Sequence, residues 1–152
     1  MANEDVAKIL EEYALPLHAM IVFRRAERTI RSQEDTAIKA HGLTPGQFGV
    51  LDVLYSKGPM RVCALVERML ATPGNMTVII RNMERDGYIT RSPDPDDKRA
   101  SRIALTDKGR AIIEETLPDH ARHVAQIFQV LSKEDQRALI RILRQFKNLK
   151  DI

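Results

Sequence analysis

The helical spacing of apolar residues along this chain is broken at Gly87. Before this glycine, apolar residues recur three and four positions apart, which is the spacing of one helix face. After it, two short runs at 88–92 and 102–105 have the length and composition of strands. The segment between them, 93–100, holds prolines and charged residues but no large apolar side chain. The pattern predicts a mainly helical chain with one small β-hairpin that has a charged tip.

Two Thr-Pro pairs mark the beginning of helices before the hairpin. Thr44-Pro45, followed by Gln47, has the pattern of a capping box and predicts a helix that ends at Gly58-Pro59. Thr72-Pro73 repeats the signal and predicts a helix to about residue 86, with Gly87 as its C-terminal glycine. The expected inner face of this second helix consists of Met76, Ile79, Ile80 and Met83.

A short helix is expected between these two, over 61–69, with Val62, Leu65 and Val66 inside. Two adjacent helices joined by a tight turn and followed by a hairpin form a winged helix-turn-helix. This motif is the central expectation for residues 41–110.

Long amphipathic helices are predicted on both sides of this motif. One covers 17–40, one runs from Thr106-Asp107 to about residue 131 with an interruption at Pro118, and a last one follows Ser132. Their apolar stripes exceed what one small domain can cover, so a second copy of the chain is expected to cover them. We expect dimerisation regions at 1–40 and 111–152 around the DNA-binding lobe, in one intertwined homodimeric domain.

Composition supports a helical protein and excludes several classes. Aromatic residues make up 5% of the chain and Trp is absent, so the core must come mainly from aliphatic side chains. No stretch approaches the ~20 apolar residues of a membrane span, and the acidic N-terminus does not resemble a signal peptide. The single cysteine, Cys63, agrees with a reducing cytoplasm, and we expect it to be structural and partly buried. The net charge of +3 permits a nucleic-acid partner.

Five fragments follow one another in a fixed order over about 43–111. They are Leu43-Thr44-Pro45-Gly46-Gln47-Phe48, Thr72-Pro73-Gly74-Asn75-Met76-Thr77, Met83-Glu84-Arg85-Asp86-Gly87-Tyr88-Ile89, Asp97-Lys98-Arg99 and Ile103-Ala104-Leu105-Thr106-Asp107-Lys108-Gly109-Arg110. In this order they resemble the MarR family of regulators. The resemblance implies a homodimeric transcriptional regulator that usually acts as a repressor on a pseudo-palindromic operator. It also implies release by a small aromatic or lipophilic effector bound between the dimer helices and the DNA-binding lobe. Two positions depart from the family pattern: Leu70 where a glycine is usual in the turn, and Val78 where a basic residue is frequent.

The expected DNA contacts lie on two elements. The outward positions of the helix beginning near residue 73, with its first turn, would face the major groove. Arg99 at the hairpin tip would enter the minor groove, oriented by Asp97, as the resemblance implies. The candidates are Thr72, Pro73, Gly74, Asn75, Thr77, Val78, Arg81, Arg85, Lys98 and Arg99.

The sequence indicates an effector site and a metal site less strongly than it indicates the DNA contacts. Tyr13, His18, Phe23 and Arg24, all in the N-terminal region, are candidate residues lining the effector site. His120 and His123 are spaced to share a metal, but two ligands do not make a site, and packing histidines are the simpler interpretation. No pattern indicates catalysis, and no cofactor or metal is expected. The alternatives are a metal- or thiol-sensing regulator of the same fold and a helical adaptor that uses the winged helix for protein contacts.

Overall fold

The computed structural model describes residues 2–69 and 73–149. Its helices are α1 (Ala2–Glu12), α2 (Ala14–Ala40), α3 (Pro45–Lys57), α4 (Val62–Met69), α5 (Pro73–Arg85), α6 (Asp107–Phe128), α7 (Lys133–Leu143) and the short 3-10 helix η1 (Arg144–Asn148), and its strands are β1 (Met60–Arg61), β2 (Ile89–Pro93) and β3 (Ser101–Leu105). The predicted fold class, mainly helical with a β-hairpin wing, is confirmed.

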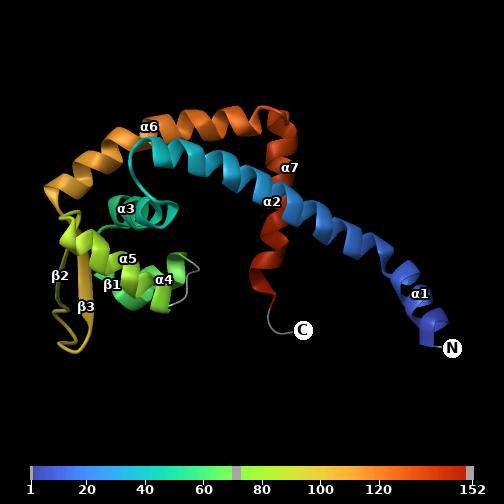
Figure 1. Ribbon diagram of the computed structural model, residues 1–152, viewed down its shortest axis with the longest axis horizontal. Coiled ribbons are helices and arrows are strands. Elements are labelled where there is room, and N and C mark those ends of the chain that lie inside the picture. The colour runs from blue at the N-terminus through green and yellow to red at the C-terminus, as the bar shows by residue number, and fades with distance from the viewer. Residues whose placement is uncertain (1, 70–72, 150–152) are drawn as a thin grey trace.

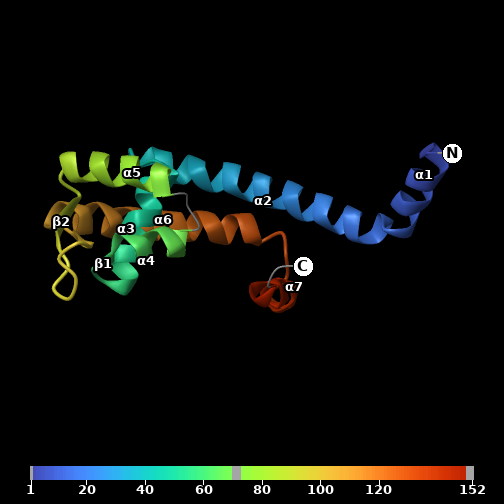
Figure 2. The ribbon, with the colours of Figure 1, turned by 90° about the horizontal axis from the view of Figure 1, so that it is seen from below.

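A lobe built from α3, α4, α5 and the three strands lies beneath one end of a pair of long helices (Figure 1). These two helices, α2 and α6, pack along each other in both views (Figures 1 and 2). Beyond the lobe, α2 continues into α1, and α6 turns into α7. The lobe is therefore held at one end of a long helical frame.

Local side-chain and backbone chemistry fixes both ends of α3. Thr44 accepts a hydrogen bond from the backbone N–H of Gln47 at 3.2 Å, and the Gln47 side chain accepts one from the Thr44 N–H at 2.9 Å. This reciprocal capping box satisfies two N–H groups that the first helical turn leaves open. At the other end, Gly58 has φ of 80°, which ends α3 in a conformation that glycine adopts without strain.

The core lies in the lobe and continues into the adjoining ends of α2 and α6, which contribute Ile38 and Ile113. Helix α3 contributes Phe48, Leu51 and Leu54, and α5 contributes the fully buried Met76, Ile80 and Met83. The spacing of the three α5 residues places them on one face, as predicted, and leaves the opposite face exposed.

The sheet has the strand order β1-β3-β2 and is antiparallel throughout. The predicted hairpin pairs Ile89 with Leu105 and Pro93 with Ser101. Strand β1 was not predicted because two residues after Gly58-Pro59 carry no alternating pattern. It pairs Met60 with Ile103 and thereby joins the hairpin to the beginning of α4.

Two predictions about the outer helices are wrong. The first helix does not begin at residue 17: α2 begins at Ala14, so Pro16 lies in its first turn, where a missing N–H is tolerated, and α1 precedes it. Pro118 does not interrupt α6, which runs unbroken from Asp107 to Phe128. Both Pro118 and Glu114, whose carbonyl loses its helical partner, are exposed, so water can satisfy that carbonyl.

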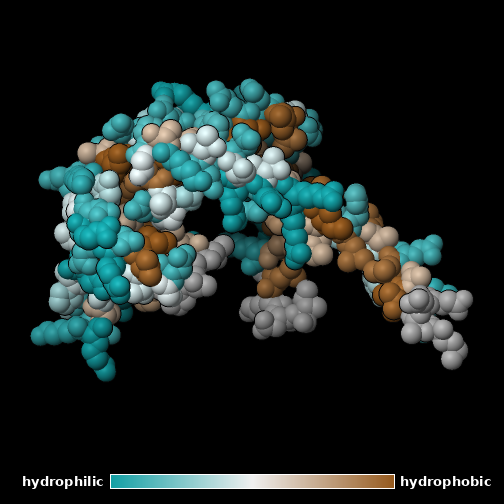
Figure 3. All heavy atoms as spheres, viewed as in Figure 1, coloured by the Kyte–Doolittle hydropathy of each residue, from teal (hydrophilic) through white to brown (hydrophobic). Residues whose placement is uncertain are grey.

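The outer helices leave much apolar surface exposed. Brown apolar residues follow the arm of α1 and the first half of α2 in Figure 3, whereas the lobe surface is mostly hydrophilic. On this arm and on α7 and η1, the exposed large side chains include Val6, Ile9, Leu10, Tyr13, Leu15, Phe23, Ile142, Phe146 and Leu149. Within the described ranges, no helix is long and apolar enough to cross a bilayer.

Candidate nucleic-acid interface

Helix α5 presents a polar face to solvent. Gly74, Asn75, Thr77, Arg81 and Arg85 are all exposed on it, opposite the buried methionines and Ile80. Asn75 offers both a donor and an acceptor, and Arg81 offers a planar set of donors, which are the groups that read base edges in the major groove. Thr72, the first candidate in sequence, lies outside the described residues, as does Leu70 of the turn, and Pro73 is the first residue of α5.

Val78 lies on this same exposed face, with 52% of its surface accessible. An apolar side chain there offers a contact for the methyl group of thymine but no hydrogen bond. The position that departs from the family pattern is therefore one of the outward positions of α5.

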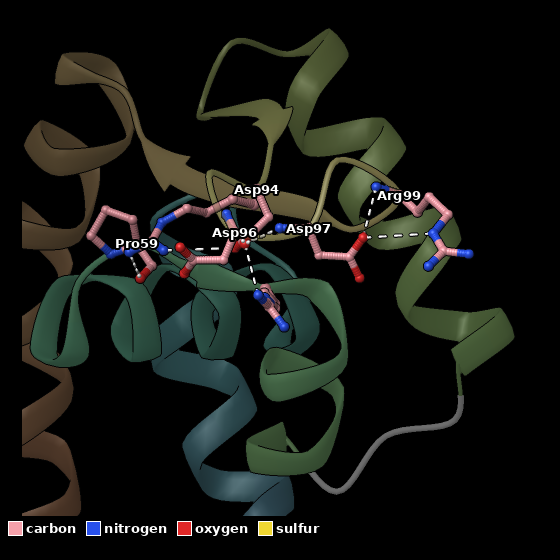
Figure 4. Close-up of polar contacts among 7 residues, drawn as sticks. Pro59, Asp94, Asp96, Asp97 and Arg99 are labelled. Atoms are coloured by element: carbon pink, nitrogen blue, oxygen red, sulfur yellow. Dashed lines mark hydrogen bonds and ion pairs between the residues drawn. The ribbon is translucent and has the colours of Figure 1, made fainter.

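The hairpin tip forms a second exposed element, with its chain folded back on itself. The Asp94 N–H donates to the carbonyl of Ala100, and the Ala100 N–H donates to the carbonyl of Asp97, both at 2.9 Å. Asp97 Oδ1 accepts the backbone N–H of Arg99 at 3.0 Å and lies 3.8 Å from Arg99 Nε (Figure 4). The Arg99 side chain is 97% exposed and extends away from the turn. Lys98 beside it is also exposed.

Beneath this tip lies a buried carboxylate that the sequence analysis did not single out. Asp94 Oδ1 accepts hydrogen bonds from Arg61 Nη2 at 2.8 Å, from the Asp96 N–H at 3.0 Å and from the Asp97 N–H at 3.2 Å. Asp94 Oδ2 lies 3.8 Å from Arg102 Nη1, and Arg102 also donates to the carbonyl of Pro59 at 3.2 Å. Arg61 and the two amides hold the pKa of the Asp94 carboxyl well below its ordinary value, against the opposing effect of desolvation.

A local signal for Asp94 is present in the sequence. An aspartate that begins a turn often accepts backbone N–H groups two or three residues on, and Asp94-Pro95-Asp96-Asp97 fits that pattern. Arg61 and Arg102 carry no such signal, because their pairing with Asp94 depends on the sheet.

Two arginines near α5 are paired with acids. Arg85, a candidate from sequence, donates from Nε to Asp86 Oδ1 at 2.9 Å, and this bond raises its pKa. Arg91 on β2 lies 3.6 Å from Glu84. The α5 candidates thus differ in setting: Asn75 stands at the beginning of the helix, and Arg85 stands at its end beside an acid.

The candidate effector residues Tyr13, His18, Phe23 and Arg24 all lie on the arm and are exposed. The larger apolar hollow, of about 930 Å³, lies between α2, α6 and α7 and is lined by Val22, Ile30, Phe128, Leu131 and Leu139, among others. A smaller one beside it, of about 450 Å³, includes Phe23. Tyr13, His18 and Arg24 line neither hollow.

His120 and His123 of α6 both contact α2. His120 Nε2 lies 2.8 Å from Glu34 Oε1 and its ring packs on Phe48, while His123 Nε2 lies 2.7 Å from the carbonyl of Gln33. Both contacts hold α6 against α2. Among residues 2–69 and 73–149, no three His, Cys, Asp or Glu side chains are grouped to hold a metal ion.

The expected partial burial of Cys63 is wrong, because the thiol is exposed. On α4 it stands two positions before the buried Leu65, so it lies about 200° around the helix from the inner face.

The MarR family model matches residues 43–101, which include α3, α4, α5, β1, β2 and the hairpin tip. A Bacillus subtilis relative, the HTH-type transcriptional regulator YkoM, is 36% identical over 135 residues, which is 89% of this chain and 88% of the relative. This similarity extends beyond the lobe into the outer helices.

Solved structures share the whole arrangement. A MarR family transcriptional regulator from Streptomyces coelicolor, in complex with DNA, has a TM-score of 0.81 at 24% identity and covers 88% of this chain and 86% of its own. Bordetella bronchiseptica BpsR, whose DNA binding is regulated by 6-hydroxynicotinic acid, has a TM-score of 0.78 at 24% identity and covers 86% of this chain and 99% of its own. Family match, relative and fold lead to one conclusion: the chain belongs to the MarR family of winged-helix transcriptional regulators.

Proposed function

We propose that this chain is a cytoplasmic repressor that binds a pseudo-palindromic operator in double-stranded DNA as a homodimer and is released by a small aromatic or lipophilic effector. In this proposal α5 enters the major groove, with Asn75 and Arg81 at base edges, and Arg99 enters the adjacent minor groove. The DNA-bound Streptomyces relative, which has the same fold, supports this assignment.

The exposed polar face of α5 carries the proposal. Its inner residues Met76, Ile80 and Met83 are fully buried, so the helix is fixed rigidly while Asn75 and Arg81 remain accessible. The N-terminal half of the helix carries no acidic side chain, and its backbone N–H groups favour phosphate. A rigid helix with an open, donor-rich face is what base reading requires.

The arm and the C-terminal helices support the proposed homodimer. Phe146 is 63% exposed and Leu15 is 79% exposed, and similar side chains continue along both regions. Soluble monomers rarely expose continuous apolar surface of this extent. A second copy removes it from water and sets the two lobes side by side for two half-sites. We place the domain limits accordingly at 1–40, 41–110 and 111–152.

Effector release is supported by the hollow of about 930 Å³ between α2, α6 and α7, whose lining is mostly apolar. A lipophilic molecule bound there would alter the packing of the two helices that carry the lobe. BpsR, a relative in fold, is regulated by an aromatic acid.

Selection of bound duplexes from a random DNA library tests the proposal. The expected result is enrichment of an inverted repeat whose half-sites lie about one helical turn, ~10 bp, apart. Binding of unselected duplexes should be weaker and should fall steeply as salt rises. A library that shows no enrichment would contradict sequence-specific binding, and a single 17.3 kDa species in light scattering would contradict the dimer.

A further inference from the structure

We infer that Asp94 is a positioning residue for DNA recognition, which fixes the hairpin tip on the lobe and thereby sets where Arg99 lies. The inference rests on the proposed function, because it assigns to Arg99 the contact that Asp94 positions. Asp94 itself is buried under the turn, with 2% of its surface exposed, and its side chain does not reach the outer surface where DNA would lie.

Asp94 is the only buried charged residue in the part of the chain that the structure describes. A buried carboxylate is costly unless donors surround it. Here the donors come from two separate places: Arg61 belongs to β1, outside the hairpin, and the amides of Asp96 and Asp97 belong to the tip. The carboxylate therefore joins the tip to the lobe.

Asp97 links Asp94 to Arg99 through two hydrogen bonds. The Asp97 amide is held by Asp94, and the Asp97 carboxylate holds the Arg99 amide. The orientation of Asp97 consequently fixes the backbone from which Arg99 extends. Without Asp94, the two tip amides and Arg61 lose their shared acceptor, and the tip can take other conformations. An arginine that must enter a narrow groove then binds with a greater loss of conformational entropy.

The inference can be tested by whether loss of the Asp94 carboxylate weakens or strengthens DNA binding. Removal of any carboxylate from a DNA-facing tip should strengthen binding, because repulsion from the phosphates is reduced. Asp94→Ala should weaken binding instead, if positioning dominates. Asp96→Ala is the matched control: it removes the same charge two residues away, from an exposed side chain.

The experiment measures operator affinity by fluorescence anisotropy for the full-length wild type, Asp94→Ala, Asp96→Ala, Arg99→Ala and the double variant Asp94→Ala/Arg99→Ala. We expect Asp94→Ala to weaken binding about fivefold to tenfold and Arg99→Ala about tenfold or more. The double variant should lie within about twofold of Arg99→Ala, because Asp94 acts through Arg99. Asp96→Ala should bind as tightly as the wild type or more tightly.

Each contrary result has a distinct meaning. Losses that add in the double variant, or an Asp94→Ala variant that binds more tightly, would overturn the role of Asp94 and leave the proposed function intact. An Arg99→Ala variant that binds like the wild type would overturn both the minor-groove contact and the inference.

A second variant guards against a general loss of folding. Arg61→Met keeps the Asp94 side chain but removes its donor from β1, so it should reproduce the loss of affinity. Circular dichroism and the affinity for random DNA should stay unchanged in whichever of the two variants folds. A folded Arg61→Met variant with wild-type operator affinity would overturn the inference.

Discussion

The hydroxyl of Thr106 donates a hydrogen bond to the carbonyl oxygen of Gly87 across 2.6 Å, and this bond joins the N-cap residue of α6 to the glycine two residues beyond α5. The Thr106 hydroxyl oxygen also accepts the N–H of Gly109 at 3.0 Å and so caps α6. Lys108 adds a bond from its Nζ to the carbonyl of Asp86 at 2.7 Å. The end of α5 is thus fastened to the long helix of the frame.

Thr106→Val should destabilise the protein by about 1–3 kcal/mol, because the cap is lost and the carbonyl of Gly87 loses its donor. Thr106→Ser, which keeps both bonds, should stay within about 1 kcal/mol of the wild type. Urea unfolding at one fixed protein concentration measures both variants. Equal stability of the valine and serine variants would contradict the role of the hydroxyl.

Gly109→Ala should be strongly destabilising for a steric reason. A Cβ at this position would stand 2.0 Å from the carbonyl oxygen of Tyr88, and backbone cannot move aside as a side chain can. We expect a loss of about 1–3 kcal/mol or more. Gly74→Ala is the matched control, since a Cβ there meets no atom within 4 Å and alanine is the better helix former. Thermal unfolding of both variants should give opposite changes in Tm.

The stability of the folded protein should depend on pH through the carboxyl group of Asp94. Its pKa is lowered in the folded protein, first by the hydrogen bond from Arg61, so its ionised form stabilises the fold at pH values above the ordinary 3.8. That contribution is lost as the pH falls through the lowered pKa. Asp94→Asn should therefore be less stable than the wild type at neutral pH, and the difference should shrink below about pH 4. Urea unfolding across this range measures it; a constant difference at every pH would refute the assignment.

Asn75 and Arg85 should affect DNA binding in different ways. Asn75→Ala should weaken binding to the operator more than to random DNA, because base-edge bonds carry sequence information. Arg85→Ala should change both about equally and by little, since its guanidinium is already paired with Asp86. Anisotropy titrations against operators with single base changes separate the two cases. Equal losses for Asn75→Ala on every duplex would exclude base reading by this residue.

The central part of the fold could be predicted because its signals are local. A capping box at Thr44, a glycine at residue 87 and three inward residues on α5 each depend on neighbours within a few positions. Such signals act before any tertiary contact forms, so the sequence reveals them directly.

The remaining features depend on distant partners. Strand β1 exists only because Met60 meets Ile103, and the burial of Asp94 depends on Arg61, far away in the sequence. Helix α6 continues through Pro118 because the tertiary frame supports it, which local propensity does not encode. The candidate DNA residues could be named from sequence and the turn at Asp94 has a local signal, but the pairing of Asp94 with Arg61 and Arg102 required the fold.

The unbroken α6 has a mechanical consequence. At 22 residues it is about 33 Å long, and its first turn is fastened to the end of α5. A tilt of about 5° around its far end moves the first turn by roughly 3 Å. That is close to the ~3.4 Å rise between successive base pairs. A helix interrupted at Pro118 would absorb such a tilt at the break, whereas this one converts it into a shift of nearly one base pair in where the lobe meets the duplex.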